Sequence, residues 1–177
     1  MIPVQRLEPA AAGDARLVDH LTGLVNEVYA IAERGLRRVR TERMTPDELR
    51  RLIRAGEVAV ATRDSRVVGS VHVHDVGGGV SLFGALVAAP DQRNTGVGRA
   101  LIALAERESR ERGIHTMRLE LLVPREWQHP SKEFLKGWYG RRGYGIVRTV
   151  AFDEAYPHLA PLLAIACDLE IREKPLR

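Results

Sequence analysis

The sequence predicts a mixed α/β (α+β) fold, with a central, mostly antiparallel sheet of about seven strands flanked by about four helices. The first observation is the order of the apolar patterns: strand, two helices, three strands, helix, strand, helix, two strands. The second is that short turns separate the three consecutive strands, which is typical of an antiparallel meander. This order is too mixed for a regular doubly wound sheet. Because 177 residues fit one domain of ordinary size, we expect a single domain over residues 1–177.

The first part of the chain predicts one strand and two helices. Residues 2–7 alternate loosely between apolar and polar side chains, as a short strand does. A helix is expected to begin at Asp14, because apolar residues then recur at helical spacing until Gly35. Thr45 is a suitable N-cap and Pro46 suits the first helical position, so a second helix is expected there, running to about residue 55.

The three strands of the meander follow. Residues 57–62 and 67–73 are rich in valine and are separated by Arg63-Asp64-Ser65-Arg66, which predicts an antiparallel hairpin. Gly77-Gly78-Gly79 marks a second turn, and residues 80–88 form the third strand.

The second half of the chain alternates between helices and strands. A helix is expected over residues 97–112 and a strand over 117–123. Ser131 is expected to cap a helix that runs to about Arg142. The two final strands are expected near 146–152 and 167–172.

Composition narrows the class of protein. Hydrophobic residues make up 45% of the chain and charged residues 28%, which is typical of a soluble globular protein. No stretch approaches the roughly 20 apolar residues of a membrane helix, and the start of the chain lacks the layout of a secretion signal. The single Cys167 lies among apolar residues, so we expect a buried, inert thiol rather than a nucleophile. These features predict a cytoplasmic protein that has no membrane partner.

The charge of +4 is a modest basic excess, and it suits a small polyanionic ligand as well as a nucleic acid. No recognised nucleic-acid motif accompanies the basic residues, so we expect no nucleic-acid partner.

The loop before the helix at Val97 carries the strongest chemical signal. Gly96 and Gly98 lie where a helix begins, and a helix N-terminus binds phosphate through its free backbone N–H groups and its dipole. Glycine lets the phosphate approach the backbone closely. Four nearby side chains could add donors or positive charge to the same anion. They are Arg93, Asn94, Thr95 and Arg99.

Two other phosphate loops fit poorly. A nucleotide-hydrolysing P-loop needs Gly-Lys-Ser/Thr, but Arg99-Ala100 follows Gly98. The dinucleotide fingerprint needs a third glycine where Leu101 stands, and the strands before the loop form a meander rather than a βαβ unit.

Residues 93–98, Arg-Asn-Thr-Gly-Val-Gly, resemble the Arg/Gln-x-x-Gly-x-Gly/Ala signature of the GNAT superfamily of acyl-CoA-dependent N-acetyltransferases. Residues 138–144, Trp-Tyr-Gly-Arg-Arg-Gly-Tyr, resemble the second recurring element of that superfamily. The resemblance extends over nearly the whole chain, and it implies a GNAT-like twisted sheet with acetyl-CoA as co-substrate.

The resemblance also implies roles for particular residues. Leu86 and Val87 would offer backbone groups to the pantetheine arm, and residues 93–98 would hold the pyrophosphate. Tyr139 matches the family tyrosine that is often proposed to protonate the leaving thiolate; a purely packing role is the alternative. The expected cofactor-binding residues are Leu86, Val87, Arg93, Asn94, Thr95, Gly96, Val97, Gly98 and Arg99.

The chain departs from the family at one position. Ser131-Lys132 stands where many relatives have an asparagine, so that contact with the cofactor is not carried over. Lys132 could meet a phosphate or be a solvated lysine at the start of a helix.

Direct transfer from the thioester to an amine needs positioning, a base and an acid rather than a covalent intermediate. The strand over 80–88 has no carboxylate, so Glu120 on the neighbouring strand is the candidate base, with a surface or ion-pair role as the alternative. His72 and His74 share a strand face at a spacing that can hold metal. No third ligand lies nearby in the sequence, so we expect exposed histidines or one that lines the acceptor pocket, and no metal site.

The acceptor pocket is expected between residues 29–45 and 127–129, where the family varies. Glu27, Glu33 and Glu42 could attract a cationic amine, whereas arginines between residues 34 and 43 could favour an acceptor that bears an acid. We therefore expect an acetyl-CoA-dependent N-acetyltransferase that acts on a small-molecule or peptide amine. The alternative is a non-catalytic acyl-CoA-binding regulatory domain. A homodimer is a further option, since family members often dimerise.

Overall fold

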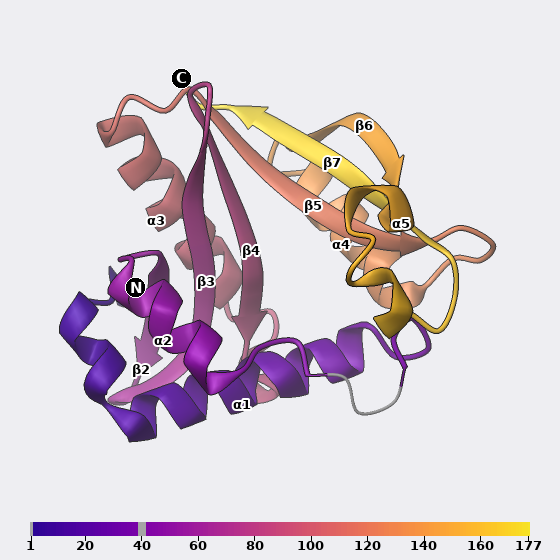
Figure 1. Cartoon of the computed structure of the whole chain (residues 1–177). Helices are drawn as coiled ribbons and strands as arrows, with labels where there is room; N and C mark the ends of the chain where they lie inside the picture. The colour runs from indigo at the N-terminus through magenta and orange to yellow at the C-terminus, as the bar shows by residue number, and fades with distance from the viewer. Residues whose placement is uncertain (1, 39–41) are drawn as a thin grey trace.

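The computed structural model describes residues 2–38 and 42–177, and its strands form one seven-stranded sheet in the order β1-β2-β3-β4-β5-β7-β6 (Figure 1). Neighbouring strands are antiparallel except for β4 and β5, which are parallel. The strands are β1 Val4–Arg6, β2 Val58–Arg63, β3 Arg66–Gly77, β4 Val80–Ala88, β5 Thr116–Pro124, β6 Gly145–Ala151 and β7 Cys167–Pro175. The α-helices are α1 Ala15–Ala32, α2 Pro46–Arg54, α3 Val97–Glu111, α4 Pro130–Gly140 and the single turn α5 Phe152–Ala155.

The predicted order of strands and long helices is confirmed, and local signals explain several boundaries. The Asp14 side chain accepts a hydrogen bond from the backbone N–H of Leu17 and caps α1. The hydroxyl of Thr45 accepts from the N–H of Glu48 and caps α2. Asp64 and Ser65 both have positive φ, as the tight turn of a two-residue hairpin requires.

Other boundaries differ from the prediction. The helix α4 is capped by His129 rather than Ser131, because the His129 ring accepts from the N–H of Ser131 and Pro130 takes the first helical position. The strand β3 runs four residues past the predicted end at Val73, to Gly77. The turn of helix α5 was not predicted. Among the described residues, no helix is both long enough and apolar enough to cross a membrane.

Helices cover both faces of the sheet. On one face, α1 and α2 bury Leu21 and Ile53 against residues such as Val60 of β2. On the other face, α3 and α4 bury Leu101 and Tyr139 in a cluster that includes Val71, Phe83 and Leu119. A third cluster, around Phe152 and Cys167, lies under the C-terminal part of the chain.

The two parallel strands at the centre of the sheet pair over only part of their length. The strands β4 and β5 pair only from Val80 with Thr116 to Phe83 with Leu119. Beyond these pairs the two strands diverge, and the part of the molecule with β5, β6 and β7 turns away from the part with β1 to β4 (Figure 1). The later residues of β4 therefore have no backbone pairing with β5 on that side.

A β-bulge stands where the strands part. Ser70 pairs with Val87, but His72 pairs with Gly84, so β4 has one extra residue there. Ala85 adopts a φ of 46° in this bulge. The bulge changes the face of the sheet to which odd-numbered side chains of β4 point. Phe83, before the bulge, belongs to the core under α3, whereas Ala85 and Val87, after it, belong to the core under α1.

Candidate active site

The loop after β4 leads into an uncapped helix. Gly96 is the N-cap of α3, has a φ of 95° and has no side chain to accept from the first turn. Helix geometry leaves the first N–H groups of α3 without acceptors inside the helix. The side chain of Val97 is buried in the core, so this residue can reach a ligand only through its backbone. A Cβ atom at Gly98 would lie 3.4 Å from the Trp138 ring, so the first turn of α3 packs directly against α4.

The remaining loop residues are exposed, and they differ in what they offer. Arg93 and Asn94 are exposed, and Asn94 has a φ of 62°. The Thr95 hydroxyl donates to the carbonyl oxygen of Gln92 at 2.8 Å, so its hydrogen is already used. A guanidinium nitrogen of Arg99 would lie 3.5 Å from a Cβ atom at Gly96, which places this positive charge at the N-terminus of α3.

Arginines gather beside this helix start. Arg99, Arg141 and Arg142 help to line a cavity of about 320 Å³ along α3, together with Glu106 and Lys174, which form an ion pair of 2.8 Å. The Arg142 guanidinium lies 3.6 Å above the centre of the Trp138 ring. Burial lowers the pKa of Arg142, and repulsion from Arg99 and Arg141 lowers it further. The buried Nε of Arg142 has no hydrogen-bond partner among the described residues. A polyanion would offset the repulsion among these arginines and could accept a hydrogen bond from this buried Nε. These residues therefore fit the phosphates of a nucleotide-like cofactor.

Tyr29 of α1 and Arg43 of the segment after α1 reach the bulge from the face of the sheet opposite α3. Burial raises the pKa of the Tyr29 hydroxyl, and the nearby charge of Arg43 and the backbone of Ala85 partly oppose this rise. The Arg43 guanidinium lies 5.0 Å from the centre of the Tyr29 ring. The backbone N–H groups of Arg43 and Met44 both donate to the side-chain oxygen of Asn26, which fixes this segment on α1.

Tyr139 lies at the point where β4 and β5 part. Its ring is 5.9 Å from that of Phe83, the last residue of β4 that pairs with β5. The side chain is buried, and burial raises its pKa far above the ordinary value of 10.0. A tyrosine hydroxyl already carries its proton at neutral pH, and the raised pKa extends this protonated state to higher pH, as a general acid requires.

Glu120 follows the last residue of β5 that pairs with β4. Its Oε2 accepts a hydrogen bond of 2.6 Å from the Tyr156 hydroxyl, and burial together with this carboxylate raises the pKa of Tyr156 to about 12. Side chains alternate along a strand, so Glu120 lies on the face opposite Leu119, whereas Tyr139 packs on the face of Leu119. The candidate acid and base thus approach the gap from opposite sides.

The two segments expected to form the acceptor pocket meet in the structure. The Nε2 atom of His129 lies 3.0 Å from the carbonyl oxygen of Arg34, and Trp127 lies beside Gly35. Residues 39–41 of the expected segment lie outside the described residues.

Lys132 has neither of the environments expected for it. It is buried, and its Nζ lies 3.1 Å from a carboxylate oxygen of the buried Glu33, which is also paired with Arg37. Burial alone would raise the pKa of Glu33, but Lys132 and Arg37 outweigh burial and hold that pKa below its ordinary value of 4.5. Lys132 is therefore neither solvated nor free for a phosphate.

We expect Glu33→Gln to lower the free energy of unfolding by about 3–5 kcal/mol, because it leaves a buried lysine without its counter-charge. The matched control is Glu27→Gln on the exposed side of α1. It should change the free energy of unfolding by less than about 0.5 kcal/mol. Urea denaturation at pH 7 measures both.

The difference in free energy of unfolding between wild type and Glu33→Gln should become smaller in acid. A carboxyl group whose pKa is lowered on folding stabilises the fold above its unfolded pKa and loses this effect as pH falls through its folded pKa. The gap between wild type and Glu33→Gln should therefore shrink below pH 4.5. A gap that stays constant from pH 7 to pH 3 would show that the Glu33 charge does not stabilise the fold.

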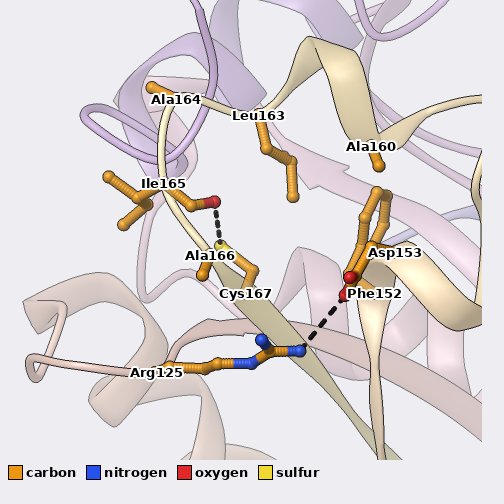
Figure 2. A pocket seen from close by; sticks show the side chains of 9 residues that line it. All are labelled: Arg125, Phe152, Asp153, Ala160, Leu163, Ala164, Ile165, Ala166 and Cys167. Carbon is orange, nitrogen blue, oxygen red and sulfur yellow. Dashed lines mark hydrogen bonds and ion pairs between the residues drawn. The ribbon is translucent and has the colours of Figure 1, made fainter.

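Cys167 lines a second cavity, of about 300 Å³, between the start of β7 and the segment after α5 (Figure 2). The prediction of a buried thiol is confirmed, and its Sγ lies 3.6 Å from the carbonyl oxygen of Ile165. At the mouth, Arg125 forms an ion pair of 3.2 Å with Asp153. Burial, followed by the Glu33 charge, raises the pKa of Cys167 to about 11.

This environment predicts an unreactive thiol. With a pKa of about 11, roughly one thiol in a thousand is ionised at pH 8. Native protein should therefore resist iodoacetamide at pH 8, whereas urea-unfolded protein should be labelled at once. Fast labelling of the folded protein, detected by mass spectrometry, would contradict this description of Cys167.

The sequence model of the acetyltransferase (GNAT) family matches residues 25–144. No curated protein matches the sequence at a significant level. Three solved structures of acetyltransferases match over nearly the full length of both chains, at identities that show a shared fold only.

The PaiA N-acetyltransferase from Thermoplasma acidophilum, in complex with coenzyme A, is 16% identical with a TM-score of 0.72, and the match covers 99% of each chain. An aminoglycoside 6′-N-acetyltransferase complexed with coenzyme A is 14% identical with a TM-score of 0.74, covering 99% of this chain and 97% of that one. The ribosomal-protein-alanine N-acetyltransferase from Brucella melitensis is 19% identical with a TM-score of 0.67, covering 98% and 99%.

Proposed function

The chain belongs to the acetyltransferase (GNAT) family, and from this premise we propose that it transfers an acetyl group from acetyl-CoA directly to a primary amine. One observation carries the proposal. The strands β4 and β5 part beside the buried Tyr139, and β4 leads straight into the uncapped, arginine-lined start of α3. This arrangement suits a long ligand with a thioester at one end and phosphates at the other.

The residues of the α3 start would hold the phosphates. The backbone of Gly96 to Arg99 supplies N–H donors, and Arg99 and Arg142 supply positive charge. Arg93 and Asn94 are exposed at the same loop and can close over the anion. Leu86 and Val87 follow the bulge in β4, and backbone groups of successive strand residues point to opposite edges. The Val87 carbonyl oxygen lies beside Gly69 of β3, so the backbone of Leu86 faces the unpaired edge of β4, which suits the pantetheine arm.

Two side chains would move the protons. The Tyr139 hydroxyl stays protonated and can donate to the leaving sulfur. Glu120 lies on the opposite side of the gap and can accept the amine proton, directly or through water. Its hydrogen bond from Tyr156 fixes the orientation of the carboxylate. Because both substrates would be held side by side, the reaction needs no covalent intermediate on the protein.

The charges around the bulge favour an acceptor that also carries an acidic group. Glu33 is already neutralised by Lys132 and Arg37, so it has little charge left for a cationic amine. The buried Nε of Arg43 has no hydrogen-bond partner among the described residues, and this guanidinium lies over Tyr29 beside the bulge. A carboxylate on the acceptor would satisfy it.

The test is a panel of amines assayed for thiol release from acetyl-CoA and for an acetylated product by mass spectrometry. We expect amino acids and acidic peptides to exceed polyamines in kcat/KM. Arg43→Gln should lower this preference by about tenfold, the effect of losing one charge-assisted hydrogen bond. Turnover of polyamines alone would contradict the acidic acceptor, and thiol release without any acetylated amine would contradict amine transfer.

We also propose that residues 1–177 act as one domain, which the continuous seven-stranded sheet supports. A cytoplasmic location is proposed because the only cysteine can form no internal disulfide. A homodimer stays a prediction.

A further inference from the structure

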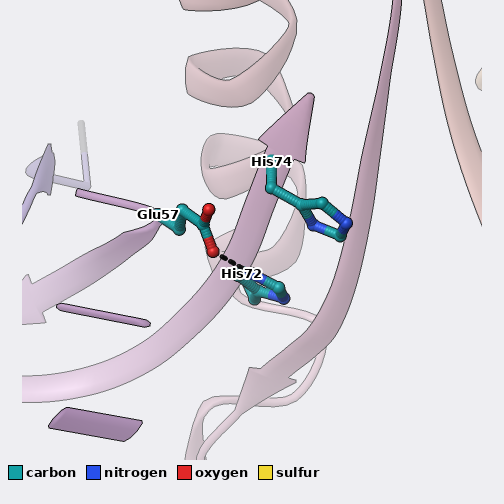
Figure 3. Close-up of side chains that lie close together, drawn as sticks. All are labelled: Glu57, His72 and His74. Carbon is teal, nitrogen blue, oxygen red and sulfur yellow. Dashed lines mark hydrogen bonds and ion pairs between the residues drawn. The ribbon is translucent and has the colours of Figure 1, made fainter. Parts of the chain in front are cut away.

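Two histidines and a glutamate converge on one face of β3 (Figure 3). His72 and His74 alternate on this strand, so their side chains share a face. Glu57 stands just before β2, and its carbonyl oxygen accepts a bond of 2.7 Å from the N–H of Val73. Pairing of β2 with β3 thus brings a residue from 15 positions upstream beside His72.

The spacing of the histidines offers only two metal ligands, and we expected no metal site because a third was missing from the nearby sequence. The structure supplies that third ligand. One carboxylate oxygen and one nitrogen of each histidine lie within 4.8 Å of one another. Two histidines and one glutamate are a donor set that holds Zn²⁺ in catalytic sites, where a fourth position stays open to water.

The distances are close to those that a metal needs. With metal–ligand bonds of about 2.0–2.2 Å, neighbouring ligand atoms of a tetrahedral site lie roughly 3.3–3.6 Å apart. The Nε2 atom of His72 lies 2.8 Å from a carboxylate oxygen of Glu57, a hydrogen-bond distance that would lengthen by about half an ångström around a metal ion. The His72 and His74 rings are stacked, with centres 4.7 Å apart and planes 14° apart. A small rotation of these half-buried side chains would therefore bring all three ligand atoms into range.

Two features point to a ligand at this cluster. The Nδ1 atom of His74 is buried, and none of the described residues offers it a hydrogen-bond partner. Across the strands, His72 faces Gly84, where an added Cβ atom would meet nothing within 4 Å. The cluster thus has an unsatisfied nitrogen and open space beside it, as a site with one free coordination position requires.

We propose that Glu57, His72 and His74 bind one divalent transition-metal ion of the Zn²⁺ type, with a fourth position open to water above Gly84. Histidine nitrogen and a single carboxylate favour such an ion over Mg²⁺ or Ca²⁺, which prefer oxygen ligands.

The test uses the full chain after removal of metal with a chelator, and Co²⁺ as the probe. Wild type should bind one equivalent, with the intense visible absorption of four-coordinate Co²⁺, and Zn²⁺ should displace it. His74→Gln removes one ligand. It should weaken binding by more than the roughly 10–100-fold that is lost when a residue hydrogen-bonded to a ligand is replaced. The matched control, His20→Gln, changes an exposed histidine on α1 and should leave binding unchanged.

Circular dichroism of each variant checks that it is folded. A wild-type protein with no such band, or a band that His74→Gln leaves intact, would overturn the site. The readout is metal binding rather than turnover, so its result does not depend on the proposed acetyl transfer.

Discussion

Tyr139→Phe is expected to lower kcat by about 10²–10⁴, the usual contribution of a general acid, while the Kd for coenzyme A stays within about threefold of wild type. The phenol lies where β4 and β5 part, and burial raises its pKa further above neutral pH, so it is protonated and able to donate. Phenylalanine preserves the ring contact with Phe83 and removes only the hydroxyl. Steady-state kinetics and calorimetric binding measure the two quantities separately.

The matched control is Tyr144→Phe in the same aromatic cluster. Its hydroxyl donates to Glu106 at 2.8 Å, so its loss should reduce stability by about 1 kcal/mol and leave kcat unchanged. Equal losses of kcat in both variants would assign Tyr139 a packing role. Absence of acetyl transfer by wild type, with coenzyme A still bound, would favour the regulatory domain instead.

Gly96→Asp is expected to weaken coenzyme A binding by at least about 100-fold. The substitution places a carboxylate at the start of α3, where the phosphates would lie, and two like charges about 4 Å apart near a protein surface repel by roughly 4 kcal/mol. The added carboxylate also offsets the positive end of the helix dipole, which would otherwise attract the phosphates. Calorimetric titration at low salt measures the loss.

Gly96→Asn is the control for backbone strain. Gly96 has a φ of 95°, where asparagine and aspartate are both tolerated better than other side chains, and asparagine has nearly the same shape without the charge. We expect its Kd to lie within about tenfold of wild type. If both variants lose binding equally, strain or bulk rather than charge explains the effect, and the phosphate role of Gly96 is wrong.

Local signals explain why most of the fold could be predicted. The caps at Asp14 and Thr45, the turn at Asp64 and Ser65 and the glycine before α3 each act within a few residues. Such signals depend on short-range hydrogen bonds and allowed φ values, so the sequence shows them directly. The α4 start was misplaced by two residues, because His129 caps less commonly than serine.

Features made by contacts distant in sequence could not be predicted. The bulge at Ala85 depends on register with β3, and the only signal was Gly84 inside a strand. The pairing of Lys132 with Glu33 joins residues 99 positions apart, and Glu57 meets His72 only through pairing of β2 with β3. The arginines beside Trp138 come together from α3 and the end of α4.

Titration of acetyl-CoA into the wild-type protein by calorimetry tests the central claim most directly. The structure predicts saturable binding of one molecule per chain, weakened by added salt because phosphate contacts at the start of α3 supply part of the affinity. The same titration with acetyl-pantetheine, which lacks the nucleotide phosphates, should give much weaker binding. No saturable binding of acetyl-CoA by folded protein would contradict the proposed function.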